Sequence, residues 1–406
     1  MAGMDGRLNI EIFPASFGDA ILVRCESDCG TVNMLIDGGV GATYEEHLAA
    51  RLQGLHSRGE KLDVVVVTHI DGDHIGGVLG LLSANGPARA PRVIDICDVW
   101  HNGYRHLNLN GRAPSESEKK KVLSQVSNAQ LGPRKEGEIS VKHAQTLATL
   151  ITKYGYAWNK AFGGKAAVSG QKVSLAPGID ITLLSPGPQN LDRLAYVWRK
   201  GLVAMGVSHE AVDCSEFESA FEMEVPRLDA DADTPDMNIS ASTITDPPSP
   251  STFIEDTSIT NGSSIAFLLE CFGLRTLFLG DSWPGVVADQ LELLHPGQSC
   301  QRVDLVKVSH HGSRHNTSPA LLDRLKARHY VISTDGAKHD HPDMGALLWI
   351  ADACEAGSSL VFNYPSDTAR RMGEANMLNR FGHKVSIGTG KAPLLIVISG
   401  EASGKG

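Results

Sequence analysis

One ten-residue segment, from Thr68 to Gly77, concentrates side chains that could bind metal ions. Four possible ligands lie within six residues of it: His69, Asp71, Asp73 and His74. His69 and Asp71 are two residues apart, so an extended backbone would point both side chains the same way. Asp73 and His74 are adjacent and must diverge, so we expect them to serve a second ion. Two ions about 3.5–4 Å apart can hold a hydroxide and stabilise an oxyanion, so the segment predicts a hydrolytic metal centre. The plainer interpretation is a polar loop in which Asp73 caps the next helix.

The elements around this segment predict a layered α/β fold. Asp63–Val67 is an apolar run typical of a strand buried on both faces, and a helix is expected from Ile75 to Leu82. Further strands are expected at Leu8–Phe13, Ala20–Arg24, Val32–Ile36, Arg92–Trp100, Ile179–Leu184, Ser264–Glu270, Thr276–Leu279, Leu305–Val308, Tyr330–Ser333, Leu360–Asn363 and Leu394–Ile398. Two β-rich halves that both carry helices indicate a four-layered αββα sandwich, treated as a single domain over residues 1–406.

The metal-binding segment resembles the His-x-His-x-Asp-His signature of metallo-β-lactamase-fold hydrolases, with Asp71 in place of the second histidine. This variant is similar to the soluble hydrolase domain of ComEC-type DNA-uptake proteins. The similarity continues, in order, through Asp37-Gly38-Gly39, Asn261–Ile265, Leu277–Asp281, Lys307–Ser313 and His341-Pro342. The resemblance implies the metallo-β-lactamase sandwich and a metal-dependent hydrolase.

The resemblance also implies roles for residues late in the chain. Asp281 would bridge both ions, one of His310 and His311 would complete the second site, and the other would lie near the leaving group. Asp281 also ends an apolar strand, which fits a rigidly placed ligand, although an aspartate after Gly280 is common in turns. The residues expected on the substrate side are Asn261, Ser263, Ser313 and His341. The alternative for His341 is a simple turn residue before Pro342.

The third histidine of the family pattern has no assigned counterpart. His101, His106 and His143 are available, and His106 with Tyr104 is favoured for the substrate side because both lie just beyond a strand end. A water molecule could complete the first site instead. Three carboxylates with three or four imidazoles predict two divalent ions, zinc or manganese, with the oxygen ligands favouring manganese.

Charge is distributed unevenly along the chain. Residues 105–175 contain twelve lysines and arginines against four acids, a net charge of +8, whereas residues 207–262 contain thirteen acids and one arginine, a net charge of −12. We expect a mainly helical basic insert at 105–175 that guides a polyanion, with Lys119, Lys120 and Lys121 as phosphate contacts. Residues 226–260 predict an acidic, flexible loop. Alternatively, both charge sets are simply solvated surface.

The leading hypothesis is a phosphodiesterase or nuclease that acts on nucleic acid or a nucleotide. Asp73 would orient or deprotonate the attacking water, and His311 or His310 would protonate the leaving oxygen. One alternative is a thioesterase, lactonase or phosphorylcholine-type esterase, for which Trp158, Phe162 and Trp198 could line an apolar pocket. The other is a binding module without turnover. We expect a cytoplasmic protein with no membrane partner, because the sequence shows no signal peptide and no apolar run of roughly 18–20 residues.

Overall fold

A computed structural model describes residues 6–107, 117, 146–204, 218, 221–222, 225–226, 244–338 and 340–400. Its first sheet has the strand order β14-β1-β2-β3-β4-β5. These strands are β1 (Gly6–Ile12), β2 (Ile21–Ser27), β3 (Gly30–Ile36), β4 (Val64–Val66), β5 (Val99–Trp100) and β14 (Leu394–Gly400). The pairs from β14 to β3 are antiparallel, while β3, β4 and β5 run parallel.

The second sheet has the order β13-β12-β11-β10-β9-β8-β7-β6. Its strands are β6 (Lys172–Ala176), β7 (Ile179–Ser185), β8 (Ala266–Cys271), β9 (Leu274–Phe278), β10 (Gln301–Lys307), β11 (Leu325–Ile332), β12 (Ser359–Phe362) and β13 (Lys384–Ile387). The pairs from β6 to β9 are antiparallel, and those from β9 to β13 are parallel. The carboxyl ends of β9 and β10 therefore lie at one edge of this sheet.

The two sheets face each other across a shared apolar core. Ile10 of β1, Phe267 of β8 and Leu305 of β10 belong to one buried cluster that includes residues of both sheets. Successive residues of a strand point to opposite faces, so Leu268, next to Phe267, belongs instead to the cluster beneath the helices of the second sheet. A fully buried side chain of this size stabilises the fold by about 1.5–3 kcal/mol.

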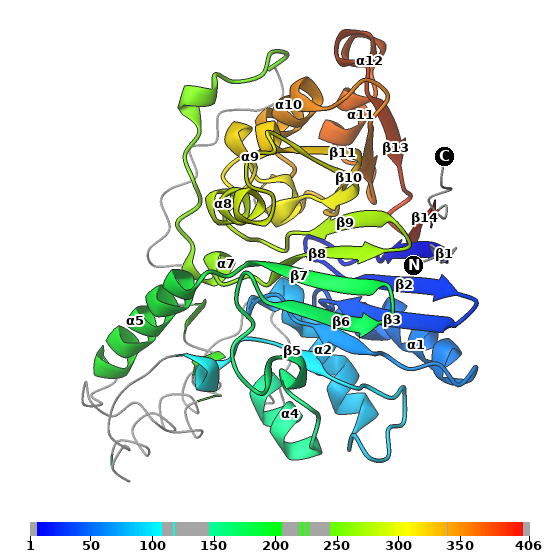
Figure 1. The fold of residues 1–406 in the computed structure, drawn as a ribbon, viewed down its shortest axis with the longest axis vertical. Helices are drawn as coiled ribbons and strands as arrows, with labels where there is room; N and C mark the ends of the chain where they lie inside the picture. Colours follow the sequence, from blue (N-terminus) through cyan, green and yellow to red (C-terminus); the bar gives the residue numbers. More distant parts are fainter. Residues whose placement is uncertain are drawn as a thin grey trace.

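Helices cover the outer face of each sheet (Figure 1). On the first sheet lie α1 (Ala49–His56), α2 (Gly72–Asn85) and α4 (Leu147–Tyr154), whose apolar residues share a cluster with those of β4. On the second lie α8 (Pro284–Leu294), α9 (Pro319–Arg324), α10 (Met344–Ala353), α11 (Asp367–Met372) and α12 (Ala375–Phe381). Helix α5 (Pro188–Ala204) lies at one side, in a smaller cluster with Tyr104 and Phe221. The four-layered αββα fold is thus confirmed.

One predicted strand is much shorter than expected. Of residues 92–100, only Val99–Trp100 pairs as β5. The side chain of Asn85, at the end of α2, accepts from the backbone amides of Val93 and Ile94 and donates to the carbonyl of Ile94. These groups are satisfied by a side chain, so they do not form a sheet ladder. Sequence reasoning also missed β6 and β13, because both are short edge strands in which only two large apolar residues alternate with polar ones.

The two charged segments are described only in part. Helix α4 lies within the basic insert expected at 105–175, whereas Lys119, Lys120, Lys121 and His143 lie outside the described residues. In the predicted acidic loop, residues 244–260 are described and contact the second half of the molecule. There the indole of Trp349 donates to the carbonyl of Pro248 at 2.7 Å. Across the described part of the chain, no helix combines the length and apolar character that a membrane crossing needs.

Candidate metal centre

The four ligand-type residues of the 68–77 segment meet Asp281, His310 and His311 at one edge of the two sheets. His69 follows β4, Asp71 precedes the first turn of α2, and Asp73 and His74 lie in that turn. Asp281 follows β9, and the two histidines follow β10 in a short helical turn, Ser309–Gly312. Because β9 and β10 are parallel neighbours, their carboxyl ends place these groups side by side.

A first group of possible ligands comprises His69, His74 and Asp281, which are all buried. Their ligand atoms lie within 4.8 Å of one another. The Oδ2 atom of Asp281 is 3.8 Å from His69 Nε2 and 3.4 Å from His74 Nε2. Asp71 adds a carboxylate oxygen 3.5 Å from His69 Nε2, and the hydroxyl of Thr260 donates to that oxygen at 3.2 Å. This arrangement can hold one divalent cation.

A second group comprises Asp73, His74 and His311, again within 4.8 Å of one another. Asp73 Oδ2 is 3.7 Å from His311 Nε2 and 3.9 Å from His74 Nε2. Asp281 belongs to the first group and to a third one, with His311 and Asp19. Asp281 thus contributes to the first and third groups, whereas His74 is common to the first and second. Among the described residues, no such group includes His310.

Three of the imidazoles have their Nδ1 atoms engaged away from the centre. His74 Nδ1 is 2.9 Å from Asp37 Oδ2, His311 Nδ1 is 2.8 Å from the carbonyl of Ser333, and His69 Nδ1 is 3.1 Å from the hydroxyl of Ser264. Their Nε2 atoms are buried and have no hydrogen-bond partner within the described structure. Unpaired buried polar atoms are costly, whereas metal-binding histidines are commonly held through the other ring nitrogen. The residues present therefore fit divalent metal ions.

Close backbone packing places Asp37 beneath His74. A Cβ atom on Gly77 of α2 would lie 2.0 Å from the carbonyl oxygen of Gly38, so only glycine allows the start of α2 to approach the 37–39 turn this closely. Asp37 itself adopts the left-handed region, with φ of 56°. Its carboxylate accepts from both the backbone amide and the hydroxyl of Thr68 at 2.8 Å, as well as contacting His74.

Opposite charges perturb the acid–base properties of the metal-free centre. Burial opposes ionisation of Asp281, but the nearby imidazoles, His74 above all, hold its pKa well below the usual range. Burial likewise opposes protonation of His74, yet the carboxylates of Asp281 and Asp37 raise its pKa well above the usual range. A metal ion must displace a proton from such an imidazole, so metal binding should depend on pH.

The two adjacent histidines occupy strained backbone. His310 and His311 have φ of 44° and 54°, a left-handed conformation that non-glycine residues seldom adopt. The ring of His310 is held by Asn316, whose side-chain oxygen is 2.9 Å from His310 Nδ1. The side chain of His310 is 23% exposed, against 3% for His311. His311 thus faces the interior of the centre, and His310 lies at its rim.

The residues predicted for the substrate side fall into two sets, of which the first lies near the centre. The amide of Asn261 is 3.4 Å from His310 Nδ1, and the ring of His341 is 5.0 Å from that of His310. The hydroxyl of Ser263 donates to the carbonyl of Thr260, and that of Ser313 accepts from the amide of His315. Ser264, which the sequence did not single out, contacts His69 Nδ1 through its hydroxyl at 3.1 Å.

The second set lies in apolar packing. Tyr104 and Trp198 are 3% and 0% exposed and pack with Phe221, and Phe162 packs against Trp100. Trp198 and Phe162 therefore contribute to the core, and the apolar pocket suggested for a small-molecule esterase is not formed by them. Trp158 contacts the guanidinium of Arg105 and the ring of His106.

Neither described candidate for the missing third histidine joins a group of possible metal ligands. Burial lowers the pKa of His101 to about 4 and that of His106 to about 3, so both rings are neutral at physiological pH. His106 Nδ1 accepts from the amide of Gly103, and His101 stacks on Trp158. The third candidate, His143, lies outside the described residues.

Sequence reasoning missed Asp19 and Lys307, which lie directly behind the centre. Lys307 Nζ is 2.6 Å from Asp19 Oδ2, and both side chains are almost fully buried. Lys307 ends the apolar strand β10, and a lysine at the end of such a strand is itself a signal, because lysine is rarely buried without a partner.

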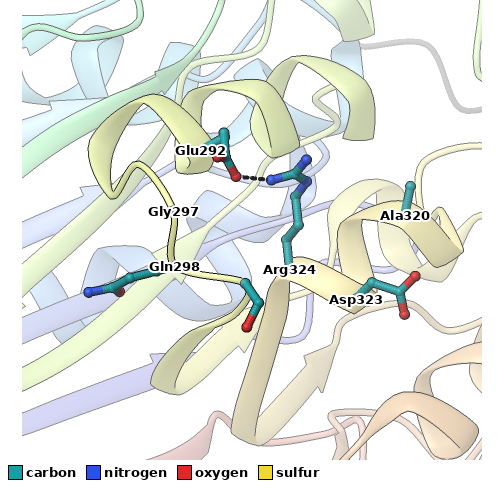
Figure 2. Close-up of a pocket in the computed structure, with 7 residues that line it drawn as sticks. Glu292, Gly297, Gln298, Ala320, Asp323 and Arg324 are labelled. Carbon is teal, nitrogen blue, oxygen red and sulfur yellow. Dashed lines mark hydrogen bonds and ion pairs between the residues drawn. The ribbon is translucent and has the colours of Figure 1, made fainter.

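A surface hollow elsewhere on the molecule has no relation to these groups. It lies between the end of α8 and α9, where Arg324 forms an ion pair with Glu292 (Figure 2). Gln298 and Ser299 line it just before β10 begins, whereas His310 follows the other end of that strand. Strand β10 has seven residues that each rise about 3.3 Å, so the hollow and the metal centre lie roughly 20 Å apart along it.

Comparison with known proteins finds one matching family model, which covers part of the chain. Residues 14–149 match the metallo-beta-lactamase superfamily. A search of curated proteins found no match. Among solved structures, a mutant of the CmlA beta-hydroxylase is similar, with 10% identity and a TM-score of 0.35, over 96% of this chain and 53% of that protein. The chain thus spans about half the length of that protein. The superfamily match over residues 14–149 agrees with the αββα layers and with the metal-capable groups at the sheet edge.

Proposed function

We propose that this protein is a metal-dependent hydrolase that cleaves phosphodiester bonds in nucleic acid or a nucleotide. The observation that carries the proposal is that Asp281 belongs to two groups of possible ligands, one with His69 and His74 and one with His311 and Asp19. A bridging carboxylate of this kind suits a pair of ions, and paired ions recur in enzymes that displace phosphate esters in line. The aspartate-rich variant of the motif, which resembles ComEC-type domains, supports the same choice of substrate.

His69, Asp71 and Asp281 would hold one ion, while Asp73, His74, His311 and Asp281 would hold the other. The ions, zinc or manganese, would supply Lewis acidity and a nucleophile at neutral pH. The protein residues keep the site rigid: Asp37, Ser264 and the carbonyl of Ser333 orient three imidazoles through their Nδ1 atoms. Asp73 accepts a hydrogen bond from the attacking water and orients it.

His310 is proposed to donate a proton to the leaving oxygen. Its side chain is the most exposed of the four imidazoles, and its Nε2 atom lies 3.7 Å from Asp281 Oδ2. Asn316 holds the ring through Nδ1, and Asn316 is in turn bonded to Asp256 at 2.9 Å. The Nε2 atom of His310 thus faces Asp281, so a proton on it would be available to a leaving oxygen bound at the centre.

The proposal is tested by a substrate panel with Mn²⁺ or Zn²⁺ added to chelator-treated protein. The panel contains single- and double-stranded DNA, RNA, cyclic nucleotides, a chromogenic phosphodiester and a thioester. We expect hydrolysis of at least one phosphodiester and its loss in Asp73→Asn. Hydrolysis of the thioester alone would support a small-molecule esterase, and absence of all turnover with metal bound would support a binding module.

The basic segment provides a test of the substrate class. If the substrate is a polyanion, Lys119→Ala, Lys120→Ala and Lys121→Ala combined should weaken oligonucleotide binding and flatten its salt dependence, by about one unit of slope for each phosphate group that the variant no longer binds. A matched control removes three charges from strands of the second sheet, those of Arg302, Arg328 and Lys384. Equal effects of the two triple variants would argue for a general charge effect and against steering by the insert.

A further inference from the structure

A buried ion pair lies behind the second half of the metal centre. Asp19 comes from the connection between β1 and β2, and Lys307 is the last residue of β10. Lys307 Nζ is 2.6 Å from Asp19 Oδ2, and the two side chains are 1% and 2% exposed. Lys307 Nζ also donates to the carbonyl of Val308 at 3.1 Å. Lys307 thus forms a hydrogen-bonded ion pair with one oxygen of the Asp19 carboxylate, Oδ2.

The other oxygen of Asp19 faces the centre. Asp19 Oδ1 is buried and has no hydrogen-bond partner within the described structure. Its neighbour His311 Nδ1, at 3.6 Å, already donates to the carbonyl of Ser333 at 2.8 Å. Ligand atoms of Asp19, Asp281 and His311 lie within 4.8 Å of one another. An unpaired carboxylate oxygen at such a place calls for a cation or another strong partner.

The backbone holds Asp19 firmly in this position. Its amide donates to the carbonyl of Asp73 at 3.3 Å, and its carbonyl accepts from Gly39 at 2.7 Å. A Cβ atom on Gly18 would lie 1.9 Å from the Asp73 carbonyl oxygen, so the two segments are in direct contact. The position of the Asp19 carboxylate is therefore tied to that of Asp73.

The charges in and behind the centre also call for bound cations. Five carboxylates gather there, those of Asp19, Asp37, Asp71, Asp73 and Asp281. Lys307 forms an ion pair with the first of them, Asp19. Five negative charges less one positive charge leave four, which two divalent ions neutralise. Buried charges are stable only when they are compensated in this way.

We propose that Asp19 is an additional ligand of the ion that His311 and Asp281 would share, and that Lys307 is a positioning residue that directs Asp19 Oδ1 toward it. The inference rests on the proposed function, because it requires a metal centre. The competing explanation is an ion pair that only joins the two halves of the fold. That explanation predicts an effect on stability and none on metal binding.

The test combines a single and a double variant, with Glu11→Gln as control. Asp19→Asn leaves the lysine without its counter-charge, whereas Asp19→Asn with Lys307→Met removes both charges and should recover most of the lost stability. Glu11 forms a partly buried ion pair with Arg51, so the control removes a comparable carboxylate elsewhere. Mn²⁺ binding is measured by calorimetry and elemental analysis, and stability by the melting temperature without metal.

We expect two ions in the wild type and in the control. In both Asp19 variants the affinity for one ion should fall about tenfold or more, even where the double variant melts like the wild type. Wild-type affinity for both ions in the double variant would overturn the inference while leaving the proposed function intact. A wild-type protein that binds no divalent ion would refute the metal centre itself, and the inference with it.

Discussion

Asp37 offers a sharp test of how the fold prepares the metal centre. Its carboxylate accepts three hydrogen bonds, from the amide of Thr68, the hydroxyl of Thr68 and Nδ1 of His74. In Asp37→Asn the amide oxygen can still accept from the Thr68 amide, but the new NH₂ group cannot accept from His74. The imidazole then favours the other tautomer, with its proton on Nε2, where it faces Asp281 and opposes metal binding.

The size of the effect follows from the bonds that change. One charge-assisted hydrogen bond to a buried imidazole is removed, which corresponds to about 1.5–3 kcal/mol of stability in the metal-free protein. Loss of such an outer-shell partner weakens metal binding by about 10–100-fold. Calorimetric titration with Mn²⁺ and with Zn²⁺ at constant pH measures the affinity, and chemical denaturation of the metal-free protein measures the stability.

Glu11→Gln again serves as the control, since it removes a carboxylate from a partly buried ion pair outside the centre. We expect it to leave metal affinity unchanged. If Asp37→Asn binds both metals as tightly as the wild type, the reasoning that Asp37 sets the tautomer of His74 is wrong. A loss of stability without a loss of affinity would reduce Asp37 to a residue that only joins β3 to α2.

Other predictions concern ligands and pH. Asp281→Asn should abolish binding of both ions in elemental analysis, because its carboxylate belongs to two groups of possible ligands; retention of one ion at wild-type affinity would contradict a bridging role. Asp71→His should lower the ratio of Mn²⁺-supported to Zn²⁺-supported activity, because imidazole is a softer ligand than carboxylate and favours zinc. An unchanged ratio would exclude Asp71 as a ligand. Metal affinity should fall as the pH is lowered from 8 to 6, because the pKa of His74 is raised in the metal-free protein and the metal must displace its proton. The fall should be up to about tenfold per pH unit for each proton displaced. Calorimetry in buffers of different ionisation enthalpy counts the protons released. Burial raises the pKa of Glu222, which accepts from the amides at the start of α4, to about 8. The fold therefore favours its protonated form, so wild-type stability should decrease as the pH rises from about 5 through 8, and Glu222→Gln should remove that decrease in denaturant titrations.

The fold was largely predictable because its strands carry strong local patterns. Leu8, Ile10 and Ile12 alternate with polar residues and belong to the core between the sheets. Prediction failed where pairing depends on a distant group, as when Asn85 satisfies the amides of residues 93 and 94 and prevents a longer β5. It also failed at β13, an edge strand of four residues in which only Val385 and Ile387 alternate with polar residues, too short a pattern to indicate a strand.

The sequence by itself determined which residues could form a metal centre. Four possible ligands within six residues, placed after an apolar strand, are constrained by local geometry alone, and the structure brings them together with Asp281, His310 and His311. Their chemistry depends on spacing along one segment, and spacing is visible in the sequence.

Only the tertiary structure decided which groups orient those ligands. Asp37 contacts His74 across 37 residues of sequence, Ser264 contacts His69 across 195, and Lys307 contacts Asp19 across 288. Each of these hydrogen bonds exists because the two sheets and the glycine-rich start of α2 bring separate segments of the chain into contact. The close approach of Gly77 to Gly38 is the clearest example of such a contact. The same packing turns His311 inward and leaves His310 at the rim, a choice that two adjacent identical residues could not reveal by themselves.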